Sequence, residues 1–176
     1  MIKNFDIKPY FTEEEIQAKI GDLALKLNEK YKGEEVYIVS VLKGSVMFAV
    51  DLAKRLTMPV KMEFVKVSSY GSGTQSSGQV NAQEFALPDL NDKNVIVAED
   101  IIDTGYTAKF LVDLLKNKFK MKSFLFCSLL NKKARRKVDI DADYYCFDVE
   151  DKFLVGYGMD YNGQFRNLPY VGYIEL

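Results

Sequence analysis

Three carboxylates and two hydroxyls stand close together in the second half of the chain. Glu99 and Asp100 directly follow an apolar run, and Asp103 comes two apolar residues later. Thr104 and Thr107 then enclose a Thr-Gly-x-Thr step. Carboxylates bind sugar hydroxyls, hold a metal ion or accept a proton, whereas the amides at the start of a helix bind phosphate. The combination indicates a site for a phosphorylated sugar.

These residues need a strand and a helix to position them. The run Asn94–Ala98 predicts a buried strand that ends at the two acids. Apolar residues at helical spacing predict a helix that follows the turn and ends near Lys118. Because open α/β sheets bind ligands at the carboxyl ends of their strands, the acids and hydroxyls are where a ligand is expected.

The rest of the chain alternates between strand and helix patterns. Thr12 and Glu15 form a capping box that opens a helix. The continuous apolar runs Val36–Leu42 and Ser123–Leu130 predict strands buried on both faces. The other predicted elements are a helix at about 46–56, a strand at 60–67, a hairpin-like return at 80–86, and short strands at 144–147, at 153–156 and in the tail. This alternation predicts an α/β fold with a mostly parallel central sheet flanked by helices.

Size and charge narrow the class of protein. A chain of 176 residues, 48% hydrophobic and 28% charged, is long enough for one domain with a sizeable core. The formal net charge of −1 argues against non-specific binding to nucleic acid or to an anionic membrane. No apolar run reaches membrane-spanning length and the first residues lack a signal-peptide pattern, so a cytoplasmic protein is expected.

The chain has no histidine, which excludes several kinds of site. A Ser-His-Asp triad, a Cys-His pair and a His-ligated zinc are all ruled out. Any metal would be held by oxygen, so magnesium is the first expectation. Cys127 and Cys146 stand in apolar surroundings and are expected to be small buried residues in a reducing compartment, without a disulfide.

Other phosphate-binding patterns are missing from the sequence. The chain has neither G-x-x-x-x-G-K-[ST] nor a G-x-G-x-x-G between a strand and a helix, which argues against a Walker-type NTPase and a dinucleotide site. The segment Ser68–Gln79 is almost entirely Gly, Ser, Thr and Gln, which predicts a flexible surface loop. Tyr70 is unusual there, because large aromatic residues are rare in plain linkers.

The segment Glu99–Gly105 resembles the phosphoribosyl-pyrophosphate motif of the type I phosphoribosyltransferases. The resemblance also includes the segments Val41–Ser45, Ser68–Gly71 and Asp151–Tyr161. The last of these narrows it to enzymes of 6-oxopurines, the hypoxanthine phosphoribosyltransferase family of purine salvage. The similarity spans roughly residues 36–166. It implies a single phosphoribosyltransferase domain over residues 1–176, with a flexible lid loop at about 68–79 and a small hood formed by the chain termini.

The resemblance implies a reaction and its partners. A 5-phosphoribosyl group would move from phosphoribosyl pyrophosphate to N9 of hypoxanthine or guanine, giving IMP or GMP and pyrophosphate, with Mg²⁺ as cofactor. A homodimer or homotetramer is implied, with no nucleic-acid or membrane partner. The alternative is a regulator of the same fold that binds RNA and senses nucleotides, for which the basic run at 132–137 is the only support.

The resemblance also assigns residues to phosphoribosyl pyrophosphate. Thr104 to Thr107 would hold the 5′-phosphate, and Glu99 and Asp100 would meet the ribose hydroxyls directly or through magnesium. In that family the peptide before Lys43 is often cis, and its loop donates backbone groups to pyrophosphate. The implied set is Lys43, Gly44, Ser69, Tyr70, Glu99, Asp100, Asp103, Thr104, Gly105, Tyr106, Thr107 and Arg166, with Ser69 and Tyr70 on the lid and Arg166 at the pyrophosphate.

The purine base would meet a second group of residues. Asp103 is the implied general base near N7, and Lys132 would donate to the exocyclic O6. Phe153 would stack on the ring, and Leu154 would offer backbone groups to its edge. Asp160 would hold a second magnesium, so the implied metal residues are Glu99, Asp100 and Asp160, and the implied purine residues are Lys132, Phe153, Leu154 and Asp160.

Several of these residues have plainer explanations. Asp103 is a favoured helix N-cap, and Thr104 and Thr107 could cap the helix without a ligand. Lys43 could be a surface charge at a turn, Phe153 could be ordinary core, and the two adjacent acids could be a solvated strand end. The remainder of the basic run is expected to be a solvated face: Lys133, Arg135, Arg136 and Lys137.

Overall fold

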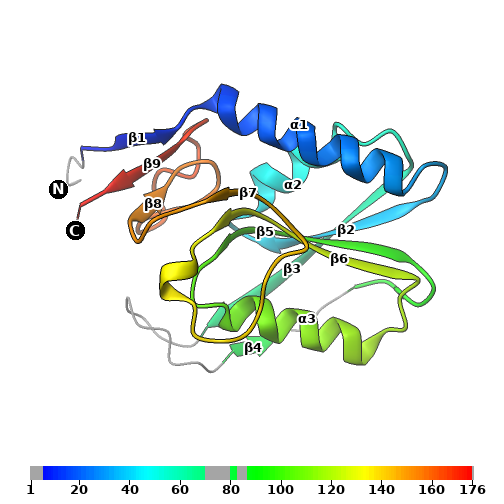
Figure 1. Ribbon diagram of the computed structural model, residues 1–176. Coiled ribbons are helices and arrows are strands. Elements are labelled where there is room, and N and C mark those ends of the chain that lie inside the picture. The colour runs from blue at the N-terminus through cyan, green and yellow to red at the C-terminus, as the bar shows by residue number, and fades with distance from the viewer. Residues whose placement is uncertain (1–5, 70–79, 83–86, 176) are drawn as a thin grey trace.

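The computed structural model describes residues 6–69, 80–82 and 87–175. Its centre is a six-stranded sheet in the order β4-β3-β2-β5-β6-β7, in which β4 is antiparallel and the other five strands are parallel (Figure 1). This confirms the predicted α/β fold with a mostly parallel sheet. The strands are β2 (Val36–Leu42), β3 (Val60–Ser69), β4 (Val80–Ala82), β5 (Asn94–Ile102), β6 (Ser123–Asn131) and β7 (Tyr144–Asp148).

Helices cover both faces of this sheet (Figure 1). α1 (Glu13–Lys30) and α2 (Val46–Ala53) lie on one face, and α3 (Tyr106–Lys118) lies on the other. The capping box at the start of α1 is confirmed, because the Thr12 hydroxyl accepts from the Glu15 amide while the Glu15 carboxylate accepts from the Thr12 amide. Each helix buries its apolar side against the sheet, which explains why Val36–Val41 of β2 has no exposed residue.

Strand β5 is longer than the sequence predicts. It continues past both acids, since its pairing with β6 extends to Ile102 opposite Asn131. Ala98 packs on the α1–α2 side of the sheet, whereas Ile102 packs with Val97 on the α3 side. In an undisturbed strand Ala98 and Ile102 would share a face. The alternation of side chains between the two faces of the sheet therefore shifts by one residue between Ala98 and Ile102, where Glu99 and Asp100 stand.

A second sheet of three strands forms the predicted hood. Its order is β1-β9-β8, with antiparallel pairing throughout, and it stands beside the carboxyl ends of the main strands (Figure 1). The sequence predicted the short strands that form β8 and β9 but not β1. Their bounds are β1 (Lys8–Phe11), β8 (Phe153–Val155) and β9 (Val171–Ile174). The predicted lid segment from Tyr70 to Gln79 lies outside the described residues.

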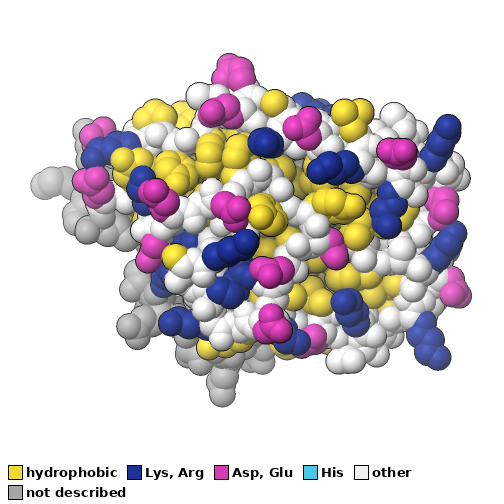
Figure 2. Space-filling model, viewed as in Figure 1, with side chains coloured by type: hydrophobic (Ala, Val, Ile, Leu, Met, Phe, Trp, Pro, Cys, Tyr) yellow, Lys and Arg dark blue, Asp and Glu magenta, His cyan; other side chains and the backbone are white. Residues whose placement is uncertain are grey.

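Three other findings bear on the class of protein. Both cysteines are free; Cys127 is buried, as the sequence predicted, whereas Cys146 is only half-buried. Among the residues that the structure describes, no helix is both long enough and apolar enough to cross a membrane. Lys and Arg side chains mix with Asp and Glu over the face seen in Figure 2, where no single basic surface forms.

Candidate active site

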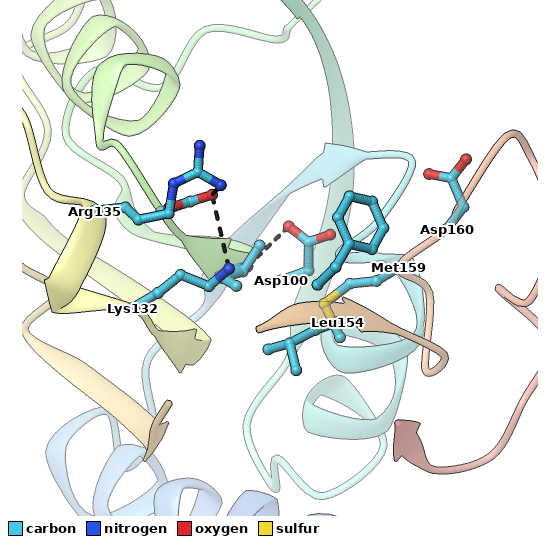
Figure 3. Close-up of a pocket in the computed structure, with 9 residues that line it drawn as sticks. Asp100, Lys132, Arg135, Leu154, Met159 and Asp160 are labelled. Atoms are coloured by element: carbon cyan, nitrogen blue, oxygen red, sulfur yellow. Dashed lines mark hydrogen bonds and ion pairs between the residues drawn. The ribbon is translucent and has the colours of Figure 1, made fainter. Parts of the chain in front are cut away.

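A pocket of about 220 Å³ opens between the carboxyl ends of the main strands and the hood. Figure 3 shows Lys132 and Arg135 on one side of it and Met159 and Asp160 on the other. Charged and apolar groups therefore face each other across a space suited to a flat polar ring. The residues that line it are Asp100, Ile101, Asp103, Lys132, Arg135, Phe153, Leu154, Met159 and Asp160.

A second pocket of about 210 Å³ lies at the start of α3. Asp100, Ile101 and Asp103 line both pockets, so the two spaces share a wall. The second pocket is lined by Glu99, Asp100, Ile101, Ile102, Asp103, Thr104, Gly105, Thr107 and Ala108. The sequence predicted that these acids and hydroxyls would meet at a strand end, and the structure brings them together.

Helix α3 begins without a side-chain cap. Its N-cap residue is Gly105, at φ 89°. A Cβ atom there would lie 2.7 Å from a methyl carbon of Ile140, so a larger residue would not fit. The capping alternative for Asp103 and Thr104 is therefore wrong. The first amides of a helix have no partner within it, so the backbone at Tyr106 and beyond offers donors to an anion.

Glu99 and Asp100 are not a solvated strand end. Glu99 is buried, and its Oε2 has no hydrogen-bond partner in the described part of the chain. Burial, with the neighbouring Asp100 carboxylate, raises the pKa of Glu99 well above its usual range. Burial also raises the pKa of Asp100, whose Oδ1 accepts from the Ile101 amide at 2.9 Å. Two desolvated carboxylates side by side are suited to a cation or to sugar hydroxyls.

The residues present fit a magnesium ion that shares its ligands with a substrate. Magnesium is commonly held by one or two carboxylates together with phosphate oxygens and water. The orphaned Oε2 of Glu99 beside Asp100 supplies such a pair. No group of three or more Asp, Glu, Cys or His side chains with metal-binding geometry exists within the described ranges, so Asp160 does not join this pair as a third ligand.

The loop after β2 lies directly against Asp100. The peptide between Leu42 and Lys43 is cis. A Cβ atom on Gly44 would overlap the Asp100 carboxylate, and a Cβ atom on Gly158 would overlap the Gly44 carbonyl oxygen. Three segments that are distant in sequence therefore meet here, and glycine is needed at two of their contacts.

Lys132 and Arg135 both approach Asp103. Lys132 is only 4% exposed, and its Nζ lies 3.9 Å from the Asp103 Oδ2 and 2.7 Å from the Lys152 carbonyl oxygen to which it donates. The Arg135 guanidinium lies 3.5 Å from the same Oδ2. The Oδ1 of Asp103 is buried and has no hydrogen-bond partner among the described residues. One oxygen of this carboxylate thus faces two cations, and the other has no donor.

The prediction of a solvated face is wrong for Arg136 but not for Arg135, whose side chain is 40% exposed. Arg135 lines the pocket, and the Arg136 side chain is only 14% exposed. Arg136 donates to the carbonyl oxygen of Asp103 at 3.1 Å and to the Asn131 side chain at 2.7 Å. It therefore ties the loop of Asp103 to the end of β6. The exposed Lys133 and Lys137 agree with the prediction.

The hood supplies the other wall of the pocket. Phe153 is half-buried, lines the pocket and packs edge-on against Tyr161 at a centroid distance of 5.4 Å, so it is not an ordinary core residue. Arg166 pairs with Asp160 at 2.5 Å and donates to the Gly158 carbonyl oxygen at 2.6 Å. These contacts hold the side chains of Asp160 and Arg166 beside Gly158, which lies against the Gly44 loop. The side chain of Ser69 and all of Tyr70 lie outside the described residues.

Five pocket residues were not predicted from the sequence, namely Ile101, Ile102, Ala108, Arg135 and Met159. Arg135 follows Lys132 by three positions, a spacing that places both on one side of the short 3₁₀ turn Lys133–Arg135, and this spacing was the available signal. Met159 had no such signal, since nothing in its neighbourhood distinguishes a pocket residue from a core residue.

Comparisons with known proteins agree with this architecture. A family model described as "Phosphoribosyl transferase domain" matches residues 7–162. The chain is 45% identical over 168 residues to the bifunctional protein TilS/HprT of Listeria monocytogenes serotype 4b (strain F2365), covering 96% of this chain and 26% of that protein. It is 42% identical over 175 residues to the hypoxanthine-guanine phosphoribosyltransferase of Streptococcus agalactiae serotype V (strain ATCC BAA-611 / 2603 V/R). This match covers 99% of this chain and 97% of that protein.

A solved structure is also similar to this chain. The crystal structure of a hypoxanthine-guanine phosphoribosyltransferase from Bacillus anthracis str. 'Ames Ancestor', with a HEPES molecule in its active site, superposes with a TM-score of 0.89 at 42% identity, over 97% of this chain and 100% of that chain. The chain thus spans about a quarter of the bifunctional relatives and nearly all of the others. The family model matches most of the chain, and the acids and the Thr-Gly-x-Thr step lie at the carboxyl ends of the strands. The chain therefore belongs to the phosphoribosyltransferase family.

Proposed function

We propose that this protein transfers the 5-phosphoribosyl group of phosphoribosyl pyrophosphate to N9 of hypoxanthine or guanine, giving IMP or GMP and pyrophosphate. The observation that carries the proposal is the shared wall of the two pockets. Asp103 faces both the phosphate-binding start of α3 and the ring-sized space lined by Lys132 and Phe153. A purine in one pocket and a phosphoribosyl group in the other would meet at this carboxylate. The relatives named hypoxanthine-guanine phosphoribosyltransferase support the same chemistry.

The phosphoribosyl group would be held at the start of α3. The backbone from Gly105 to Thr107, with the hydroxyls of Thr104 and Thr107, would bind the 5′-phosphate. Glu99 and Asp100 would bind the ribose hydroxyls and Mg²⁺, whose charge would stabilise the departing pyrophosphate. The raised pKa of Glu99 is what a carboxylate awaiting a cation would show, because the cation restores the charged form.

The pyrophosphate would leave beside the loop after β2. Lys43 and Gly44 would donate backbone groups to it, and Arg166 would add a guanidinium, which suits phosphate oxygens. Asp160 would hold a second magnesium through water, and its pairing with Arg166 supports a place near this group. Ser69 and Tyr70 would close over the site and exclude water from an oxocarbenium-like centre.

The base would be recognised through its oxygen at C6 and through the face of its ring. Lys132 Nζ uses one of its three hydrogens on the Lys152 carbonyl, which leaves donors for O6 of an oxopurine. Phe153 would stack on the ring, and Leu154 would offer backbone groups. Asp103 would accept the proton at N7 while N9 attacks the sugar, a form of catalysis that contributes about 10²- to 10⁴-fold.

The RNA-binding alternative loses its support. Lys132 is buried, and the Arg136 guanidinium donates hydrogen bonds to oxygen atoms of the protein itself. Two of the run's cations are thus unavailable to a phosphate backbone.

We further propose that the whole chain acts as one domain in a cytoplasmic homodimer or homotetramer. The exposed apolar side chains of Met47, Val50 and Phe64 would be covered in such an assembly. Free thiols fit a reducing compartment. Sedimentation equilibrium would distinguish a dimer or tetramer from a monomer.

The decisive experiment mixes the protein with phosphoribosyl pyrophosphate, Mg²⁺ and one base at a time: hypoxanthine, guanine, xanthine or adenine. Nucleotide and pyrophosphate should form in equal amounts with an oxopurine. Failure to form nucleotide with any base would end the proposal. Asp103→Ala should lower kcat far more than it weakens phosphoribosyl pyrophosphate binding, and an unchanged kcat would remove Asp103 from the chemistry.

A further inference from the structure

A partly buried hydrogen-bond cluster lies on the α1–α2 side of the sheet. The Tyr157 hydroxyl donates to the Asp51 carboxylate at 2.6 Å, and Gln17 donates to the same oxygen at 2.8 Å. Arg55 donates to the Gln17 side-chain oxygen at 2.6 Å. Gln17 belongs to α1, Asp51 belongs to α2, and Tyr157 belongs to the segment after β8. The cluster therefore joins three elements that are far apart in sequence.

The protonation states of this cluster are well defined. Tyr157 is only 4% exposed, and burial together with the Asp51 carboxylate raises the pKa of its hydroxyl, which stays a donor at neutral pH. Burial acts to raise the pKa of Asp51, but hydrogen bonds from Tyr157, Gln17 and Lys54 outweigh it and hold that pKa below its usual value. A neutral phenol therefore donates to a charged carboxylate, which is among the stronger kinds of hydrogen bond in proteins.

The backbone at Tyr157 needs such an anchor. Tyr157 has φ 47°, between Gly156 at 91° and Gly158 at 98°. Three successive residues in the left-handed region are unusual, and a bulky residue stays there only when its surroundings hold it. The amides of Tyr157 and Gly158 donate to the carbonyl oxygens of Leu168 and Arg166. The Tyr157 side chain attaches this turn to Asp51 of α2.

The anchored turn reaches the pyrophosphate side of the site through two close contacts. Gly158 lies against the Gly44 carbonyl oxygen, and Gly44 lies against the Asp100 carboxylate. The Gly158 carbonyl oxygen also accepts from Arg166. A shift of the turn would thus move Gly44 and Arg166, which belong to the proposed pyrophosphate site. On the base side, Lys132 belongs to the loop after β6 and lies outside this turn, whereas Met159 of the turn also lines the base pocket.

We propose that Tyr157 and Asp51 are positioning residues for pyrophosphate: their hydrogen bond sets the turn at Gly158, and the turn sets the loop at Gly44. The inference rests on the proposed function, because it takes the Gly44 loop as the pyrophosphate-binding loop. It goes beyond that function by assigning a role to two side chains that do not line either pocket.

Tyr157→Phe removes only the hydroxyl and tests the proposal. The KM for phosphoribosyl pyrophosphate should rise by about tenfold and kcat should change by less than about twofold. The KM for hypoxanthine should rise by less than about threefold, because Met159 of the same turn also lines the base pocket. Calorimetric titration with Mg²⁺ and inorganic pyrophosphate should show the same loss of affinity. This titration needs no turnover, so it decides the inference even if the wild type forms no nucleotide and the proposed function fails.

Tyr31→Phe is the matched control. Tyr31 is also buried, at 3% exposure, and its hydroxyl bonds Ser123 at the opposite end of the sheet. It should leave pyrophosphate affinity unchanged whatever it does to the melting temperature. The double variant Asp51→Ala with Tyr157→Phe should bind pyrophosphate no more weakly than Asp51→Ala alone. Unchanged pyrophosphate affinity in Tyr157→Phe, equal rises in KM for both substrates, or additive losses in the double variant would each overturn the proposal.

Discussion

Replacing Lys132 with methionine gives the sharpest test of how the base is chosen. Methionine keeps the unbranched apolar stem and removes only the ammonium group, so the pocket wall keeps its shape. Lys132 Nζ donates to the Lys152 carbonyl oxygen at 2.7 Å and stands 3.9 Å from Asp103 and 3.8 Å from Asp151.

The magnitude follows from the hydrogen bond that O6 would lose. A hydrogen bond to a charged group contributes about 1.5–3 kcal/mol, which corresponds to about 10- to 150-fold in kcat/KM. Adenine carries a donor at C6 and gains no such bond from Lys132, so its kcat/KM should hardly change. The preference for hypoxanthine over adenine should therefore fall by the same 10- to 150-fold. Stability should change little, because relief of a buried charge offsets the lost bond to the Lys152 carbonyl.

The assay compares initial rates for hypoxanthine, guanine and adenine, with adenine also tested as a competitive inhibitor. Lys133→Met is the matched control, since Lys133 is the next residue, carries the same charge and is 63% exposed. It should leave all three kcat/KM values near those of the wild type. An equal fall for oxopurines and adenine in Lys132→Met, or a comparable loss in Lys133→Met, would refute the reasoning.

Three other outcomes are expected. Gly44→Ala should lower kcat/KM for phosphoribosyl pyrophosphate by about 100-fold in steady-state kinetics, since its methyl group would displace the Asp100 carboxylate, and wild-type kinetics would contradict the close contact. Arg136→Ala should lower the free energy of unfolding by about 3 kcal/mol in urea titrations, because it leaves several buried acceptors unpaired, and a change below about 1 kcal/mol would show that the guanidinium is dispensable. Burial raises the pKa of Cys127, and that of Cys146 to about 12, so iodoacetamide should alkylate neither thiol in the native protein and both after unfolding, as mass spectrometry would show.

The sequence predicted best those elements whose residues are buried on both faces. The bounds of β2 came out as predicted because every residue from Val36 to Val41 is apolar or small, so the pattern begins and ends with the strand. The end of β5 was not predicted correctly, because acidic residues that follow an apolar run usually lie in solvent. Here the pairing with β6 continues to Ile102, and it carries Glu99 and Asp100 into the sheet.

The site was predictable where one segment holds the chemistry and unpredictable where distant segments meet. The acids and hydroxyls of residues 99–107 are neighbours in sequence, so their convergence followed from one strand and one turn. The burial of Arg136 depends on carbonyl oxygens in other segments, which no local pattern reveals. Strand β1 was missed for the same reason, since Lys8–Phe11 is a strand only through its pairing with β9.

That pairing of β1 with β9 bears on the order in which the protein assembles. Lys8 and Glu175, which form an ion pair beside it, are 167 positions apart, so this contact closes a loop that spans nearly the whole chain. Contacts of such separation are slow to form, whereas β2, β5 and β6 are joined by much shorter connections. We therefore expect the main sheet to form first and the hood last. Phe153 would then reach its place over the base only at the end of folding, so affinity for a purine would be acquired later than the secondary structure of the main sheet.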